Sequence, residues 1–248
     1  MADTKNGFGG ISAFALHILA MGLMLCDHLW ATVVPLPLLG WLGRIAFPIF
    51  AYMLVEGYFH TRSLRRYALR LLLFALLSEI PFDLFYGGTV FYPFHQNVLW
   101  TLLLSLLCIY LIESTRRLGK RWLTALVVLA VALLGFLLGF LTMIDYYGYG
   151  VLTVLVFYLF RERKWTCLLG QILLLGYIHW EMMGGLSVPI RVFGTTVYLV
   201  QQGTALLALI PIWLYRGRQG PHNRWTRLIF YAFYPLHMLI LFLLQLIS

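Results

Sequence analysis

Ionisable side chains inside apolar runs are the residues of this sequence most able to do chemistry. Asp27 and His28 lie together in the first apolar run, and Arg44 lies at the start of the second. A charge in the hydrocarbon core of a membrane costs about 2.5–3.5 kcal/mol even on a mild insertion scale, so such residues are rarely incidental. All three are candidates for a catalytic group. From these residues alone, His28 is either a catalyst or a hydrogen-bonding packing residue.

Glu79 and Asp83 form a second candidate group. Residues spaced i,i+4 share one face of a helix, and Pro81 between the two acids should kink that helix. Two carboxylates on one face in a low dielectric do not readily both ionise without a cation, and Arg44 is the nearest candidate by predicted topology. The pair either takes part in a reaction or caps and anchors the end of a membrane span.

Arginine is concentrated beside a third i,i+4 pair, Glu56 and His60. Arginine binds phosphate through forked, charge-assisted hydrogen bonds. A basic cluster at a membrane edge is a topology signal first, but this one is dense enough to hold phosphates as well. Four guanidinium groups lie within nine residues, at Arg62, Arg65, Arg66 and Arg70.

The composition decides the environment of these groups. Of 248 residues, 62% are hydrophobic and 11% are charged, whereas soluble domains carry roughly 25% charged residues. The chain is therefore predicted to be an integral membrane protein, which excludes the soluble enzyme classes. The net charge of +9 is spread in short clusters between apolar runs, which indicates membrane topology and not nucleic-acid binding.

Apolar runs of about 17–25 residues predict an all-α polytopic helix bundle with about nine transmembrane helices, within a range of eight to ten. Segment 181–193, which contains Pro189, is expected to be re-entrant or interfacial. One membrane domain covers 1–248, with a tail over 1–12, a catalytic core over 13–114 and the later spans over 115–248. The expected spans are 13–31, 43–60, 67–86, 97–114, 122–142, 146–160, 165–180, 194–215 and 227–247.

Basic residues fix the expected orientation, because cytoplasmic loops are enriched in Lys and Arg. Every second predicted loop is basic, which places the N-terminus in the cytoplasm and the C-terminus outside, in the inner (cytoplasmic) membrane. The clusters follow spans two, four, six and eight, as Arg62–Arg70, Arg116–Arg121, Arg161–Lys164 and Arg216–Arg227.

With that orientation, the polar groups of the membrane region converge on the extracytoplasmic side. We therefore expect an outward-opening polar chamber lined by spans one to four. Four further histidines, His17, His60, His222 and His237, are expected to be packing or hydrogen-bonding residues. The residues expected at the chamber are Asp27, His28, Arg44, Glu79, Asp83, His95, Asn97 and Asp145.

Four motifs in this part of the chain resemble a known family. They are Met-Leu-Cys-Asp-His at 24–28, Gly-Arg-Ile-Ala-Phe-Pro-Ile-Phe-Ala-Tyr-Met-Leu-Val-Glu-Gly at 43–57, His-Thr-Arg at 60–62 and Ser-Glu-Ile-Pro-Phe-Asp-Leu at 78–84. Together and in this order they resemble the TraX family, whose namesake is a conjugative-plasmid protein required for N-terminal acetylation of F-pilin. The resemblance is dense over about 15–105 and thinner beyond.

The TraX family is in turn similar to a larger group of membrane acyltransferases that use cytoplasmic acetyl-CoA as donor. In that group an early-span histidine and membrane-embedded arginines serve the reaction. The resemblance therefore implies a catalytic role for His28 and a supporting role for Arg44. It does not extend to Arg62–Arg70, whose assignment rests on their charge alone.

These lines of reasoning give one mechanistic hypothesis, in which acetyl-CoA is the donor substrate and no metal is needed. The cytoplasmic arginines, with Glu56 and His60, hold the coenzyme phosphates, and the pantetheine arm reaches the outer chamber. His28 acts as general base or as transient acyl carrier. A carboxylate of Glu79 or Asp83 orients its ring. Substrate or oxyanion contacts come from Arg44, His95, Asn97 and Asp145.

Two other classes of function stay open. A proton- or cation-coupled transporter would also use outward-facing acids and spans broken by proline, but the two halves show no internal repeat. A structural partner in pilus assembly would not need so many acids near the membrane. Besides membrane lipids, the acceptor is undetermined among a pilin-like peptide amine, a surface sugar, a lipid head group and a small molecule.

Overall fold

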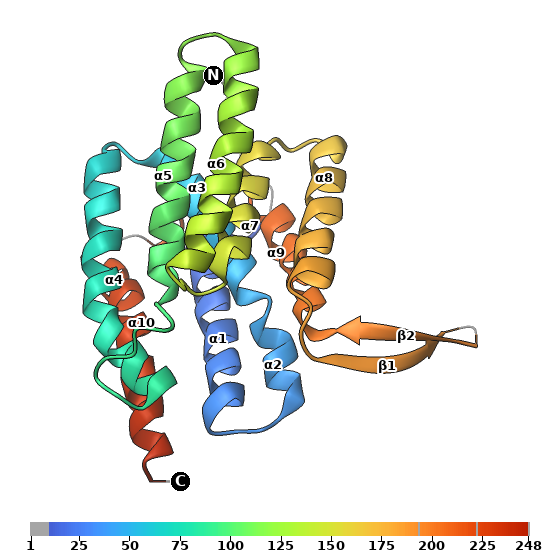
Figure 1. Ribbon diagram of the computed structural model, residues 1–248. Coiled ribbons are helices and arrows are strands. Elements are labelled where there is room, and N and C mark those ends of the chain that lie inside the picture. Colours follow the sequence, from blue (N-terminus) through green and yellow to red (C-terminus); the bar gives the residue numbers. More distant parts are fainter. Residues whose placement is uncertain (1–9, 193, 222, 248) are drawn as a thin grey trace.

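The computed structural model describes residues 10–192, 194–221 and 223–247, so most of the expected tail and His222 lie outside the described residues. The first half of the chain is helical (Figure 1). Its elements are α1 (Ala13–Thr32), α2 (Pro37–Gly43), α3 (Ala46–His60), α4 (Leu64–Gly87) and α5 (Val98–Arg116).

The second half adds further helices and one β-hairpin. The strands β1 and β2 pair antiparallel from Ser187 opposite Val200 to Val192 opposite Thr195. The helices are α6 (Arg121–Leu141), α7 (Tyr147–Leu159), α8 (Trp165–Gly176), a π-helix η1 (Tyr177–Met182), a 3-10 helix η2 (Gln201–Ala208), α9 (Leu209–Leu214) and α10 (Arg224–Gln245), and the strands are β1 (Ser187–Val192) and β2 (Thr195–Val200).

Several helices have the length and composition of membrane spans. Within the described residues, five apolar segments reach 18 residues or more, at Ala13–Thr32, Pro37–His60, Val98–Arg116, Arg121–Leu141 and Leu228–Gln245. The chain is thus a largely helical protein with several helices long and apolar enough to cross a membrane. The count of nine spans and the cytoplasmic N-terminus stay predictions.

Local sequence explains where the helices near the site begin and end. Ser12 caps α1 by accepting a hydrogen bond from the backbone N–H of Ala15 at 3.2 Å. Asn97 caps α5 by accepting from Leu99 N–H at 3.0 Å. Short polar side chains at this position satisfy backbone donors that the first helical turn leaves unpaired. Gly88 ends α4 with φ of +65°, a left-handed conformation that glycine adopts without strain.

The core of the bundle lies around α3 and α7. In the apolar window of Pro37–His60, 61% of residues are buried inside the protein, against 17% for Arg121–Leu141. Ile49 and Val55 of α3 meet Val151 and Phe157 of α7 in one fully buried cluster. The helix α3 is therefore central, whereas most of α6 faces the surroundings, as expected for a lipid-facing helix.

Close packing of α6 on α7 depends on two glycines. Gly135 and Gly139 have the spacing of small residues that lets membrane helices pack closely, and both are buried. A Cβ on Gly139 would lie 2.5 Å from the backbone nitrogen of Gly148. Backbone atoms cannot move aside as a flexible side chain can, so the absence of a side chain at this position brings the two helices together.

Gly139→Ala should therefore destabilise the bundle by about 1–3 kcal/mol through overpacking. Gly22→Ala is the matched control, because it lies inside α1 with no atom within 4 Å of the added Cβ; alanine there should be neutral or slightly stabilising. Thermal unfolding in detergent measures both. Equal melting temperatures for the two variants would contradict the close packing of α6 on α7.

The hairpin corrects the predicted eighth span. The expected span over 194–215 begins as strand β2, and its helical part starts only at Gln201. Residues 187–200 are rich in Val, Ile and Thr, which favour strands, and Gly194 in the connection has a φ of +82°. A window that measures only hydrophobicity cannot separate such a hairpin from the start of an apolar helix.

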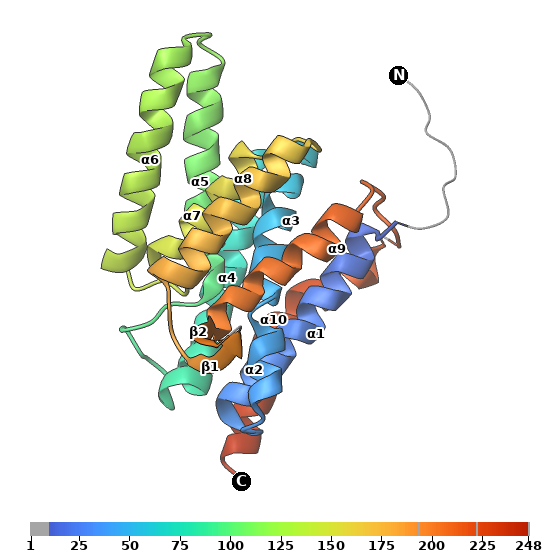
Figure 2. The same ribbon diagram turned by 90° about the vertical axis from the view of Figure 1, so that its right-hand side faces the viewer.

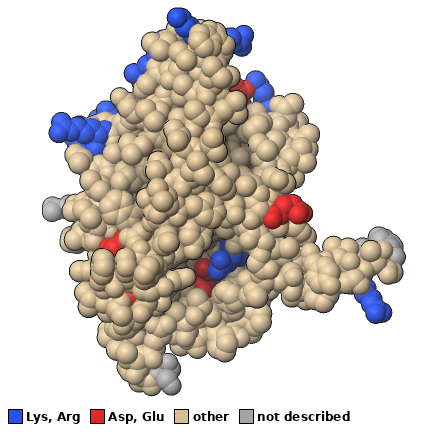
Figure 3. Space-filling view, in the orientation of Figure 1, with Lys and Arg blue, Asp and Glu red and all other residues tan. Residues whose placement is uncertain are grey.

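The two ends of the bundle differ in charge. We call the end that carries the α3–α4, α5–α6, α7–α8 and α9–α10 connections the basic end. Lys and Arg gather there in the space-filling view (Figure 3), and α5 and α6 extend past the other helices at this end (Figures 1 and 2). The α1–α2 connection, the α4–α5 loop and the hairpin lie toward the opposite end, which we call the outer end.

Candidate functional site

A cavity of about 330 Å³ lies between α1, α3, α4, α7 and α10, in the outer half of the bundle. Its walls are rich in aromatic side chains, with Phe47, Phe85, Tyr86, Tyr146 and Tyr234 among them. Its ionisable residues are Asp27, His28, Arg44, His95 and Asp145. Five of the eight residues that the sequence predicted for a polar chamber thus line one cavity. Figure 3 shows a hollow in the lower half of the molecule in which acidic and basic surfaces adjoin.

A second, more open groove of about 710 Å³ lies at the basic end between α5 and α6. Its ionisable lining residues are Arg116 and Arg121, and the rest are small or aliphatic apart from Thr124. It offers neither a general base nor a carboxylate. The smaller outer cavity is therefore the candidate site, although its volume is less than half that of the groove.

His28 is paired with a histidine from the far end of the chain. Its Nδ1 lies 2.7 Å from Nε2 of His237, and the two rings are parallel within 1°. Nδ1 of His237 lies 2.7 Å from the carbonyl oxygen of Phe233, one turn earlier in α10. A carbonyl can only accept, so this Nδ1 carries a proton and donates it.

The tautomers of both rings follow from this arrangement when both are neutral. Because Nδ1 of His237 carries the proton, its Nε2 must accept, and Nδ1 of His28 must donate to it. Nε2 of His28 then bears a lone pair, and it has no hydrogen-bond partner among the described residues. A cavity-lining imidazole with a free lone pair and a fixed orientation is the arrangement that general-base or nucleophilic catalysis requires.

Asp27 and Arg44 form an ion pair beside this dyad. The two side chains are 16% and 21% exposed, so the pair is largely removed from water. Gly43 permits the close approach of α2 to α1, because a Cβ there would lie 2.3 Å from Cβ of Asp27. Nε of Arg44 is buried and has no hydrogen-bond partner among the described residues, so this N–H can still bind an acceptor.

His95 and Asp145 form the third polar pair of the cavity, with Nε2 of His95 3.3 Å from Oδ1 of Asp145. The His95 ring also stacks on Tyr86 with centroids 4.5 Å apart. Asp145 lies in the α6–α7 turn, where Tyr146 and Tyr147 both have positive φ, at +61° and +47°. Such conformations are strained for bulky residues and are concentrated at functional sites.

Glu79 and Asp83 lie elsewhere, which corrects their predicted roles. Oε2 of Glu79 accepts hydrogen bonds from Asn97 and from Nε1 of Trp100, the latter at 2.8 Å. Asp83 accepts from the backbone N–H of Tyr92 at 3.0 Å. Neither of the two acids lines the cavity, and Asn97 does not line it either. The face of α4 that they share is turned toward α5 and the α4–α5 loop.

The prediction that Glu79 or Asp83 orients His28 is therefore wrong, as is the prediction that Arg44 neutralises them. His237 takes the first role, and Asp27 is the partner of Arg44. Asn97 donates to the carbonyl of Ala75 at 2.8 Å as well as to Glu79. Together these contacts fasten α4 to the start of α5, which is the anchoring role that the sequence left open for the two acids.

Sequence reasoning missed His237 as a site residue. It is separated from His28 by 209 positions, and nothing in the pattern of α10 links the two helices. A histidine followed by apolar residues, two positions after Pro235 in the last span, resembles a packing residue. The one available signal was the rarity of a histidine in the middle of a membrane span.

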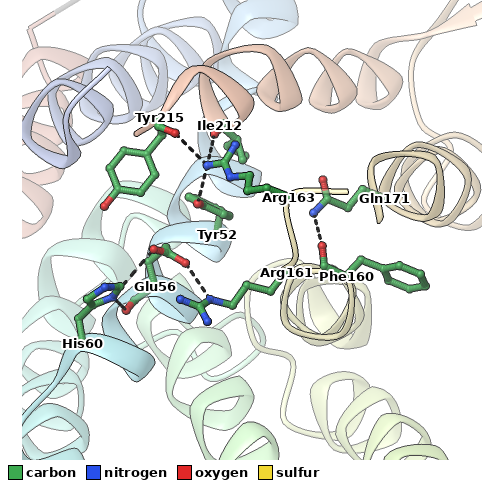
Figure 4. A network of polar contacts seen from close by, with 9 residues as sticks. All are labelled: Tyr52, Glu56, His60, Phe160, Arg161, Arg163, Gln171, Ile212 and Tyr215. Atoms are coloured by element: carbon green, nitrogen blue, oxygen red, sulfur yellow. Dashed lines mark hydrogen bonds and ion pairs between the residues drawn. The ribbon is translucent and has the colours of Figure 1, made fainter. Parts of the chain in front are cut away.

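At the basic end, Glu56 belongs to a different polar network (Figure 4). Its Oε1 accepts from Nε of Arg161 at 2.9 Å. The guanidinium of Arg161 also lies 4.0 Å from the centre of the Phe59 ring. Nδ1 of His60 lies 2.8 Å from the carbonyl oxygen of Glu56. Because a carbonyl only accepts, this Nδ1 carries the proton and donates it. Arg161 is thus held in place while both its terminal nitrogens stay unpaired within the described chain.

Arg163 in the same network has a structural role (Figure 4). It donates to the carbonyls of Ile212 and Tyr215 at 3.0 Å, to that of Trp213 at 3.1 Å and to the Tyr52 hydroxyl at 3.1 Å. These contacts tie the α7–α8 connection to α3 and to the C-terminal end of α9. A guanidinium with four protein acceptors has little capacity left for a ligand.

The four predicted phosphate-binding arginines are exposed on the first turns of α4 and just before it. The guanidinium of Arg70 lies 5.8 Å from the Tyr67 ring centre. Among residues 10–192, 194–221 and 223–247, none of the four has an ion-pair partner. The exposed arginines are therefore available to an anion. At the α7–α8 connection, by contrast, Lys164 pairs with Glu162, and this hydrogen bond lowers the pKa of the Glu162 carboxyl.

The outer cavity does not extend to the basic end. Its lining reaches Phe50 of α3 and includes neither Glu56 nor any of the four arginines. Between the two levels, α3 presents Ala51, Leu54 and Val55, which are at most 3% exposed. In this conformation apolar side chains fill the path that the predicted pantetheine arm would follow.

Comparisons with known proteins agree over nearly the whole chain. A family model described as TraX protein matches residues 12–245. A protein of Dichelobacter nodosus named "Probable fimbrial assembly protein FimC, serogroup H1" is 28% identical over 246 residues, covering 93% of this chain and 94% of that protein. No solved structure matches the chain.

Proposed function

Because the chain belongs to the TraX family, with the match spanning residues 12–245, we propose that it is a membrane-embedded acetyltransferase. It moves an acetyl group from acetyl-CoA to an amine or hydroxyl acceptor. The observation that carries this proposal is the His28–His237 dyad, whose 2.7 Å hydrogen bond leaves Nε2 of His28 without a partner among the described residues, beside an aromatic cavity.

His28 acts on the acceptor in the simplest form of the reaction. Its Nε2 removes the proton as the acceptor nitrogen or oxygen attacks the thioester carbonyl. The tetrahedral intermediate then collapses, the C–S bond breaks, and the coenzyme leaves with the proton returned by His28. In the acyl-carrier form, Nε2 itself attacks the thioester carbonyl, the C–S bond breaks and the coenzyme leaves as its thiolate. The acceptor then attacks the acetyl carbonyl, the bond from the acetyl group to Nε2 breaks, and the acceptor's proton passes to the thiolate. His237 keeps the His28 ring in the tautomer that both forms need.

Arg44 is the candidate for oxyanion stabilisation. Its ion pair with Asp27 fixes the guanidinium at the cavity wall, and its Nε–H has no protein acceptor among the described residues. A preorganised donor in a site of low dielectric stabilises developing negative charge more strongly than the same donor in water. Asp27 is thereby a positioning residue for Arg44.

The donor phosphates are assigned to the basic end. Arg62, Arg65, Arg66 and Arg70 supply exposed guanidinium groups, and we add Arg161, which Glu56 and Phe59 hold with its terminal nitrogens unpaired. The acetyl-bearing arm must then pass between α1 and α3 toward His28. Since buried apolar side chains of α3, among them Leu54, lie between the two levels, donor binding requires the helices to move apart.

Replacing Arg65 and Arg66 together with alanine should raise the KM for acetyl-CoA by about thirtyfold, because each of the two lost charge-assisted contacts costs roughly 1 kcal/mol. The value of kcat should change little. Arg117→Ala with Arg121→Ala, at the α5–α6 connection of the same end, is the charge-matched control. An unchanged KM in the first variant moves the donor site elsewhere.

The decisive experiment for the function is transfer of labelled acetyl groups by the purified, reconstituted protein. Coenzyme A should also raise its melting temperature, whereas proton-coupled solute uptake into vesicles without a donor would indicate a transporter.

The name of the 28% identical relative favours an acceptor associated with fimbriae. Comparing acetylated proteins, sugars and lipids in cells with and without the gene identifies that acceptor.

A further inference from the structure

The hairpin of β1 and β2 stands apart from the helices. It projects sideways from the bundle, across the direction of the helix axes (Figure 1). A two-stranded hairpin alone is at best marginally stable in water. The conformation of this hairpin therefore calls for a surface on which it rests.

The register divides the hairpin into two unlike faces. Residues directly opposite each other in an antiparallel pair point to the same side, and successive pairs alternate. One face consists of the pairs Val188–Leu199 and Ile190–Val197, and the other carries the pairs Pro189–Tyr198 and Arg191–Thr196. Thr195, which pairs with Val192 at the tip, also belongs to the first face, so this face is apolar except for the Thr195 hydroxyl, while the second face holds the Thr196 and Tyr198 hydroxyls and the Arg191 guanidinium.

The apolar face of the hairpin is exposed in the isolated chain, as are leucines of the preceding helix. Val188, Ile190 and Val197 are 48%, 38% and 41% exposed. The preceding helix α8 exposes Leu169 and Leu173, at 56% and 62%. Both α8 and the hairpin therefore offer exposed apolar side chains to surrounding lipid.

We propose that the hairpin lies flat in the interface of the bilayer at the outer end, with the Val188–Leu199 and Ile190–Val197 face on the acyl chains. Arg191 and Tyr198 then lie at the level of the head groups, where arginine binds lipid phosphate and tyrosine is enriched. In Figure 3 the basic surface on this protrusion faces away from the basic end of the bundle, as this orientation requires. The hairpin closely follows Met183, which lines the cavity, so its anchoring fixes the depth of the cavity in the membrane.

Site-directed spin labelling of the reconstituted full chain tests the proposal. The free cysteines Cys26, Cys108 and Cys167 are replaced with alanine, and single cysteines are placed at Val197 and at its neighbour Thr196. Collision rates are measured with oxygen, which partitions into lipid, and with a water-soluble nickel complex. If the cysteine-free chain misfolds, both variants are made in the native background and the signal of the unsubstituted protein is subtracted.

The expected result is a reversal between adjacent residues, with oxygen collisions dominating for Val197→Cys and nickel collisions for Thr196→Cys. Nickel collisions dominating at both sites would show a hairpin in water and overturn the proposal. Low collision rates with both reagents at Val197→Cys would show that protein, such as a second copy of the chain, covers the face, and would also overturn it. None of these outcomes depends on acetyl transfer.

Discussion

His28→Ala should lower the rate of acetyl transfer by about 10²–10⁴-fold, the range lost when a positioned general base is removed. An acyl carrier would lose at least as much. The loss should fall on kcat, because we propose that the donor phosphates bind at the opposite end of the bundle. Steady-state transfer of labelled acetyl groups in proteoliposomes measures it, with gel filtration to establish that the variant is folded.

Variants of His237, the hydrogen-bond partner of His28, test whether the two histidines act together. His237→Ala should lower kcat by a smaller factor, since the base remains but its tautomer and orientation are no longer held. His237→Gln should restore part of the rate, because the amide oxygen can accept from Nδ1 of His28. Joining His237→Ala to His28→Ala should cost nothing more, as for residues that act as a unit.

His17, which lies in α1 as His28 does, is the control. His17 stacks on Phe230 with ring centroids 4.6 Å apart and does not line the cavity. His17→Phe should keep the stacking and leave kcat unchanged. Full activity of a folded His28→Ala protein would remove the proposed mechanism, and additive losses in the double variant would separate His237 from it.

Arg44→Met should destabilise the folded protein by about 3 kcal/mol or more, because it leaves Asp27 as an uncompensated charge in a largely buried site. Asp27→Asn should do the same to Arg44. The double variant should regain much of the loss, since a neutral pair carries no such penalty. The coupling energy follows from a double-mutant cycle of unfolding in mixed micelles.

The exposed pair Lys164–Glu162 is the matched control for this cycle. Its side chains are 68% and 66% exposed, and solvated ion pairs contribute little to stability. Lys164→Met should leave unfolding unchanged. Equal effects of Lys164→Met and Arg44→Met, or a double variant no more stable than the single ones, would show that burial of the Asp27–Arg44 pair does not decide its energy.

Much of the candidate site was predictable, because an ionisable residue inside an apolar run can be recognised from the sequence alone and is costly to place in a membrane. Asp27, His28, Arg44, His95 and Asp145 were selected on this ground, and all five line one cavity. The phosphate-binding role of Arg62–Arg70 and the catalytic role of His28 stay predictions. Glu79 and Asp83 share a face as their spacing requires, but spacing does not say toward which neighbour that face turns.

The hairpin shows a second limit. Hydropathy averaged over a membrane-length window reads residues 194–215 as one apolar run, although 195–200 form a strand and 201–214 are helical. Alternation of apolar and polar residues over such a short stretch competes with the stronger apolar signal of the helix that follows. The β-branched residues on both sides of Gly194 favour strands, and Gly194 itself indicates the turn between them.

The sequence alone determined that the chain consists of apolar helices typical of a membrane protein and where its basic loops fall. It also determined which ionisable residues lie in apolar segments, where a charge is costly. These properties depend on single residues and their near neighbours, whose solvation is set by composition. The tertiary structure decided that His237 and not an acid orients His28, that Arg44 pairs with Asp27, and that Glu79 faces α5. Such pairings depend on the rotation and packing of helices far apart in the chain, which no local pattern encodes.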